Sequence, residues 1–244
     1  VQAEEGVGMR HPAALIAAVG AVFVGGCAAP SRAPVSEAAG TVAWIGAQHK
    51  AVHEGDSGGK VRLDDLGRRP HLYAVGPLAG LIGEITVLDG RATISTVQDD
   101  EFRTHESLDQ SAAFLAWAYV PEWSRTPLPE SVRTLDDLEA FLPGAARAAG
   151  LDAGAPLVFQ VVGRVESLKY HVLSPPDPRL PPAEAHEKAK TRASVGASGV
   201  RMVGFYSTQH RGEFTPGTSD VHVHFVSEDG RSAGHVEGFT LAPG

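Results

Sequence analysis

The stretch SDVHVHFVSEDGRSAGHVEGF, residues 219–239, contains two segments of alternating side chains around the pair Asp229-Gly230. An Asp-Gly pair between two such segments is typical of a two-residue turn in a β-hairpin. That turn places His224 opposite His235, and the alternation of side chains puts His222 on the same face. The other face is mainly apolar, as expected of a strand that covers a core. The stretch therefore predicts a hairpin with three imidazoles on one face.

These three histidines predict a metal site. Facing Cβ atoms in an antiparallel pair lie about 4.5 to 5.5 Å apart, which allows three ring nitrogens to meet one ion. His222, His224 and His235 are the expected ligands, and zinc is the expected ion because three neutral imidazoles and one open position match catalytic zinc sites. Iron, manganese or nickel would fit the same ligands. The same register pairs His222 with Glu237, which predicts a carboxylate at the site.

The composition limits the remaining possibilities. The chain has 244 residues, is 43% hydrophobic and has a formal net charge of −8. It is long enough to form one large domain or two small ones. No run of lysine and arginine interleaved with aromatic residues occurs, so nucleic acid is not an expected partner.

The N-terminal segment has the pattern of an export signal. An apolar run over residues 13–24 follows Met9-Arg10 and is too short to span a membrane. Val24-Gly25-Gly26-Cys27 resembles the lipobox of bacterial lipoproteins, in which the cysteine carries the lipid. We therefore expect a signal peptide over residues 1–27, a tether over 28–40, and an exported protein anchored to the membrane through lipid on Cys27. The alternative is a small buried cysteine. As Cys27 is the only cysteine, no disulfide can form within the chain.

The rest of the chain has mostly strand-like segments. A capping pattern at Thr134 to Asp137 and four apolar residues predict one helix that ends near Gly144. A polar insert over residues 181–193 is expected to be helical. The predicted fold class is α+β and β-rich, with a mixed β-sheet domain over residues 41–149. A smaller β-barrel-like domain over residues 150–244 is expected to carry the metal site.

A second hairpin is predicted around Asp89-Gly90. The turn places Glu84 opposite Ser95 and on the same side as Thr86, whereas the other side is apolar. Glu84 is therefore expected on a polar face. It is either a site carboxylate or a solvated residue of the strand.

Three segments resemble the bacterial α-acetolactate decarboxylase family. They are the run from Val203 through the histidine hairpin, GPLAGLIGEITVLDG at residues 76–90, and the FQVVG stretch that begins at Phe159. The resemblance implies a mixed-sheet domain plus a β-barrel domain, usually as a dimer. It also implies zinc bound by the three histidines, with Glu84 reaching the metal-bound water or the substrate. The implied reaction converts acetolactate, a 2-hydroxy-3-keto acid, into acetoin and CO₂.

The chain departs from the family pattern at several positions. Pro77 stands where the family has a threonine, and alignment on Gly163 puts Gln160 at the position of the family's substrate-binding arginine. Gln160 keeps hydrogen-bond donors but lacks the fixed positive charge. Arg164 is a possible substitute if the strand continues unbroken. The family's C-terminal glutamate has no counterpart, and Glu237 is either its replacement or a partner that orients an imidazole.

Two other classes of function remain open. The pattern from Gly217 to Gly234 approximates the first cupin motif, which would make Glu228 a ligand, although the second cupin motif is missing. A tethered carrier of a metal or small ligand is the other alternative. His171 and His210 are further candidate site groups, although such residues are more often structural or surface histidines.

Overall fold

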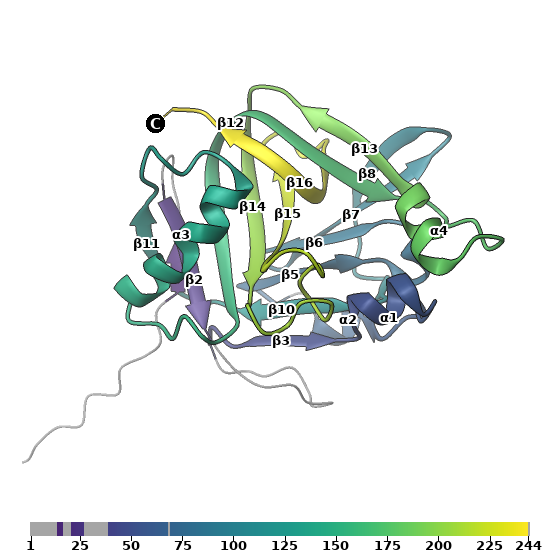
Figure 1. Cartoon of the computed structure of the whole chain (residues 1–244), viewed down its shortest axis with the longest axis horizontal. Helices are drawn as coiled ribbons and strands as arrows, with labels where there is room; N and C mark the ends of the chain where they lie inside the picture. Colours follow the sequence, from purple (N-terminus) through teal and green to yellow (C-terminus); the bar gives the residue numbers. More distant parts are fainter. Residues whose placement is uncertain (1–13, 17–20, 27–38, 68, 244) are drawn as a thin grey trace, which may run out of the picture.

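The computed structural model describes residues 14–16, 21–26, 39–67 and 69–243, and it contains two large β-sheets packed face to face (Figure 1). The first sheet has the strand order β3-β10-β5-β6-β7-β8. Its strands are β3 (Val42–Ile45), β5 (Leu72–Pro77), β6 (Glu84–Leu88), β7 (Arg91–Gln98), β8 (Glu101–Glu106) and β10 (Leu115–Tyr119). The predicted β-rich class is confirmed.

All strand pairs of the first sheet are antiparallel, so the prediction of a mixed sheet over this part is wrong. The physical reason is the short connections: β5, β6, β7 and β8 follow one another through loops too short for a parallel crossover. The predicted hairpin register is confirmed, because Glu84 pairs with Ser95 and Thr86 with Thr93.

The second sheet has the strand order β1-β11-β2-β12-β14-β15-β16, with β13 paired to β12. Its strands are β1 (Ala14–Ile16), β2 (Ala21–Gly26), β11 (Trp123–Pro127), β12 (Leu157–Leu173), β13 (Lys190–Val195), β14 (Ser198–Tyr206), β15 (Val221–Ser227) and β16 (Ala233–Leu241). The parallel pair β1–β11 makes this sheet the mixed one.

The long strand β12 determines the shape of the second sheet. Its first half pairs with β14, and its second half pairs with β16 on one edge and β13 on the other, with register shifts near Val165 and Lys169. These pairings curl the sheet, because β12 pairs both with β14 and with β16, the second strand of the β15–β16 hairpin. The β-barrel-like domain that we expected over residues 150–244 stays a prediction.

In the described part of the chain, four helices accompany the sheets: α1 (Gln48–His53), α2 (Leu63–Leu66), α3 (Leu135–Ala148) and α4 (Pro182–Ala189). A 3₁₀ turn (Ala79–Leu81) precedes β6, and the short strands β4 (Val61–Arg62) and β9 (Ser111–Ala112) pair with each other. The capping box between Thr134 and Asp137 is confirmed. Helix α3 continues past the predicted end at Gly144, because its buried face extends to Ala145 and Ala146. The expected helical insert is confirmed in part as α4.

The two sheets share an apolar core that places the histidine hairpin. Val158, Val203 and Phe205 of the second sheet pack in one cluster with Trp44 and Tyr73 of the first. Helix α3 covers the second sheet through a separate cluster. Within the described residues, none of the helices has the length and apolarity needed to cross a membrane. The polar face of β6 consequently meets the imidazole face of β15 inside the molecule.

Candidate metal centre

The structure brings His222, His224 and His235 together, each with a ring nitrogen within 4.8 Å of the others. His224 pairs with His235 across the β15–β16 hairpin, as its Asp-Gly turn predicts. His222 and His224 are buried, and His235 is partly exposed. No other group of three histidine or acidic side chains is this closely arranged in the part of the chain that the structure describes.

The outer nitrogens of two rings have hydrogen-bond partners that orient the rings, and the partner of His222 also fixes its tautomer. The Nδ1 of His222 lies 2.8 Å from the Phe214 carbonyl oxygen, an acceptor that requires a proton on Nδ1. The Nδ1 of His224 lies 3.2 Å from the Thr86 hydroxyl oxygen. The Thr86 hydroxyl can accept as well as donate, so it is compatible with a proton on His224 Nδ1, and in that tautomer both Nε2 lone pairs face inward. Such outer partners orient metal-bound histidines in proteins.

The nitrogen geometry and the pKa shifts both suit a divalent metal. The Nε2 atoms of His222 and His224 are 3.1 Å apart, and two ligands about 2.0 to 2.1 Å from a tetrahedral zinc ion lie about 3.3 Å from each other. Burial lowers the pKa of His222 to about 4 and those of His224 and His235 well below their ordinary value. The rings are therefore neutral at pH 7, as metal ligands must be.

Glu84 lies directly beside the three histidines. Its carboxylate oxygens are 3.7 Å from His224 Nε2 and 3.9 Å from His171 Nε2, and the residue is 2% exposed. Burial raises the pKa of Glu84 well above its ordinary value, although a backbone hydrogen bond from Leu173 opposes the shift. The interpretation of Glu84 as a solvated strand residue is wrong. Gly83 permits this packing, because a Cβ there would lie 2.5 Å from the Ser95 carbonyl oxygen.

His171 joins the cluster from β12, and Glu237 supports it from outside. The His171 ring stacks on His235 with ring centroids 4.6 Å apart, and its Nδ1 lies 3.0 Å from a Glu237 oxygen. Arg192 binds the same carboxylate. The hydrogen bond with His171 lowers the pKa of Glu237. The predicted register would pair Glu237 with His222, but β16 leaves β15 after His235 and pairs with β12 instead, so Glu237 contacts His171.

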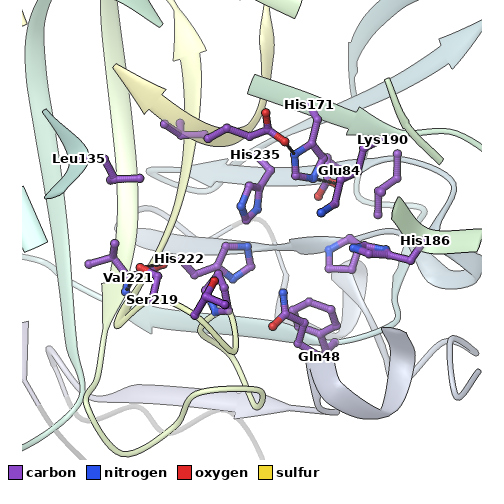
Figure 2. A pocket seen from close by; sticks show the side chains of 17 residues that line it. Gln48, Glu84, Leu135, His171, His186, Lys190, Ser219, Val221, His222 and His235 are labelled. Atoms are coloured by element: carbon purple, nitrogen blue, oxygen red, sulfur yellow. Dashed lines mark hydrogen bonds and ion pairs between the residues drawn. The ribbon is translucent and has the colours of Figure 1, made fainter. Parts of the chain in front are cut away.

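A cavity of about 270 Å³ opens over the histidines (Figure 2). Its described lining contains His222, His235, His171, Glu84, Glu237, Gln48, His186, Lys190, Pro77, Phe114, Leu135, Leu173, Pro216, Thr218, Ser219, Val221 and Val236. A cavity of this size holds a small organic molecule.

Four sequence-predicted residues lie outside this cavity. Gln160 is buried beside Tyr73 and is separated from His224 by β14, which puts it two strands or roughly 10 Å away. Arg164 is exposed and lines a different cavity. Glu228 is exposed next to the turn, so the ligand set of the cupin alternative is not assembled. His210 packs between Trp44 and Phe214 and binds Ser207.

Several site residues were missed by sequence reasoning. Thr86 and the Phe214 carbonyl orient the imidazoles, and Gln48, His186 and Lys190 line the cavity. Thr86 could have been found from the predicted hairpin, since it shares a side with Glu84. The other four come from segments whose proximity depends on tertiary packing.

A β-rich protein with three inward-facing histidines and a buried carboxylate at the base of a cavity belongs to the class of candidate metalloenzymes. A family model described as "Alpha-acetolactate decarboxylase" matches residues 49–244. The chain therefore belongs to the alpha-acetolactate decarboxylase family, and a decarboxylase-like function follows from that membership. The predicted resemblance is confirmed.

Three solved structures have the same fold at low sequence identity. The acetolactate decarboxylase of Bacillus subtilis subspecies spizizenii matches with TM-score 0.64, 16% identity and coverage of 82% of each chain. The alpha-acetolactate decarboxylase of Bacillus subtilis strain 168 has TM-score 0.60 and 14% identity, covering 82% of this chain and 81% of its own. A Staphylococcus aureus protein of unknown function, similar to alpha-acetolactate decarboxylase, has TM-score 0.60, 16% identity and the same coverage. No curated protein sequence matches the chain.

Proposed function

We propose that this chain is a zinc-dependent carboxy-lyase that decarboxylates a 2-hydroxy-3-keto acid, with acetolactate as substrate and acetoin and CO₂ as products. The observation that carries the proposal is the position of Glu84, a buried carboxyl group 3.7 Å from the Nε2 atom of His224. Membership of the family supports the reaction class.

His222, His224 and His235 would hold the metal ion. A bound divalent ion supplies a Lewis acid that draws electron density from neighbouring hydroxyl and keto oxygens of a substrate. The chain's own contribution is to present three neutral imidazoles, of which His222 is oriented by Phe214, His224 by Thr86 and His235 by stacking on His171. Zinc is the proposed ion because this donor set leaves one coordination position open.

Glu84 would act as the proton donor. The bond between the substrate's carboxylate carbon and its neighbouring carbon breaks, CO₂ departs, and the electron pair of that bond passes to the adjacent keto group. Glu84 then delivers a proton to the carbon that lost CO₂. Burial favours the protonated carboxyl group, which suits a general acid near neutral pH. Glu237, which is fixed by Arg192, would keep His171 in place beside Glu84.

Acetoin formation from acetolactate by metal-loaded protein tests this proposal. Glu84→Gln should retain the metal and lower turnover roughly 100-fold or more, the usual scale for a positioned acid. Glu228→Gln, an exposed change beside the hairpin turn, is the control and should keep wild-type turnover. If fully metal-loaded wild-type protein does not turn over acetolactate, the proposed decarboxylase activity is contradicted. A carrier of a metal or small ligand would then account better for the three histidines.

A further inference from the structure

The cavity over the histidines has a basic side. Figure 2 shows His186 and Lys190 on the right, opposite Leu135, Val221 and Ser219, with His222 and His235 between them. His186 lies on α4 and Lys190 begins β13. Lys190 is the only lysine or arginine among the described residues that line this cavity.

The same two residues line a neighbouring cavity. That cavity, of about 300 Å³, has Gln48, His186, Lys190, Pro216 and Thr218 in common with the cavity over the histidines. Lys190 therefore stands where the two cavities meet, and its side chain is 20% exposed.

The charges around the cavity leave Lys190 available to an anion. Its Nζ lies 2.7 Å from Glu187, which also binds Arg192, so this carboxylate is shared between two cations. A lysine ammonium has three N–H donors, and one bond to Glu187 leaves two. Glu237, the exposed carboxylate of the cavity, is engaged by His171 and Arg192.

His186 supplies a second polar group beside Lys190. Its Nδ1 is buried and has no hydrogen-bond partner among the described residues. A buried nitrogen without a partner is costly unless a ligand or water satisfies it. Lys190 also acts at a distance, since its charge partly opposes the rise in the pKa of Glu84 that burial causes and adds to the lowering of the pKa values of His171 and His186 by burial. Its field therefore reaches the carboxyl group that we propose as the proton donor.

We propose that Lys190 binds the carboxylate of the substrate, with the His186 ring supplying a further hydrogen bond. This inference rests on the proposed function, and it assigns recognition of the anion to the α4–β13 junction instead of Gln160. The carboxylate's charge is lost as CO₂ leaves, so the ion pair is stronger in the bound substrate than in the transition state. Loss of Lys190 should therefore raise KM without lowering kcat.

The direct test measures binding without turnover. The ligand is 2,3-dihydroxy-2-methylbutanoate, a hydroxy acid that lacks the keto group and cannot decarboxylate by this route, and its neutral counterpart is 2,3-butanediol. Calorimetry on metal-loaded protein should show that Lys190→Met weakens binding of the acid about 10-fold to 100-fold, as expected for a charge-assisted bond. Binding of the diol should not change, and Lys190→Arg should keep most of the affinity for the acid.

Lys188→Met is the matched control. Lys188 lies on α4, pairs with Glu184, is 63% exposed and lies outside the cavity, so its loss should leave the affinity for the acid unchanged. Equal affinity of wild type and Lys190→Met for the acid, or no binding by wild type, would overturn the inference. If binding of the acid depends on Lys190 but acetolactate is not turned over, only the proposed reaction is contradicted. Since Lys190 pairs with Glu187 near the surface, its replacement should leave the protein folded.

Discussion

His222 and His224 lie on one strand, but they are held by different parts of the molecule. The Phe214 carbonyl accepts from His222, whereas Thr86 of the other sheet contacts His224. His235 enters from β16 and stacks on His171. Because each ring also has a partner outside the three histidines, the nitrogen cluster is preorganised, and loss of one ring should leave the other two in place.

At the residue scale, replacement of a single histidine tests the ligand set. His224→Ala should reduce bound zinc from about one ion per chain to a small fraction, since two imidazoles are too few for tight binding. Metal analysis after dialysis measures the loss, and a CD spectrum establishes that the variant is folded. Glu228→Ala serves as the comparison and should retain the ion. A His224→Ala variant with full zinc content would exclude this cluster as the metal site.

At the scale of elements, the two hairpins were predictable because each is determined locally. An Asp-Gly turn fixes the register, and the register fixes which side chains share a face, as the pairs His224–His235 and Glu84–Ser95 demonstrate. The position of Gln160 depends instead on the strand order. Alignment with the family pattern on Gly163 predicts the place of Gln160 along β12. It does not predict that β14 lies between Gln160 and His224.

The position of helix α4 beside the cavity could not be predicted from the sequence. Its polar composition indicates a surface helix, and nothing local shows that His186 and Lys190 reach the metal cavity. Their position follows from the long β12 strand and from the contact of α4 with α1, which joins segments far apart in the sequence. Likewise, Glu237 contacts His171 because β16 crosses from β15 to β12.

His186 should make the stability of the protein depend on pH. Burial lowers its pKa from 6.5 to about 4, so as pH falls below 6.5 the unfolded chain takes up a proton that the folded chain refuses. The contribution of the neutral His186 ring to the free energy of unfolding is fully present above pH 6.5. It is lost progressively as the pH falls toward 4. We expect wild type to lose on the order of 1 kcal/mol more than His186→Gln between pH 7 and pH 5, after allowance for partial exposure.

Urea unfolding of wild type and His186→Gln at pH 8, 7 and 5 measures this difference. At pH 8 the His186 imidazole is neutral in both the folded and the unfolded chain, so the difference between the two proteins at that pH gives the effect of the substitution on packing alone. Parallel dependence of the two free energies of unfolding on pH would show that His186 does not contribute.

At the scale of the whole molecule, the predicted export signal and the second sheet involve the same residues. Strand β2 pairs with β12 over Leu157–Val161, and β1 pairs with β11. Removal of a signal peptide over residues 1–27 would delete both strands. Cys27 and residues 28–38 of the predicted tether over residues 28–40 lie outside the described residues, so lipidation stays a prediction.

We predict that the chain folds without its first 27 residues. The described residues from Val42 onward form four hydrophobic clusters, and one of these clusters joins the two sheets. The metal ligands lie on β15 and β16, and Glu84 lies on β6 of the other sheet, so none of them is on a strand that pairs with β2. Removal of β2 would leave five residues of β12, Leu157–Val161, without strand partners on that edge. The same five residues keep their pairing with β14 on the other edge.

We therefore expect protein lacking residues 1–27 to fold, to bind about one metal ion and to melt within several degrees of the full-length chain. Differential scanning calorimetry and metal analysis on both forms measure this. In bacterial cells, full-length protein should fractionate with membranes in a processed, lipidated form, and Cys27→Ser should remain unprocessed. If the truncated protein is unfolded while the full-length protein is folded and found in the cytosol, β1 and β2 are permanent strands of the sheet, because a cleaved segment cannot contribute to the stability of the mature protein.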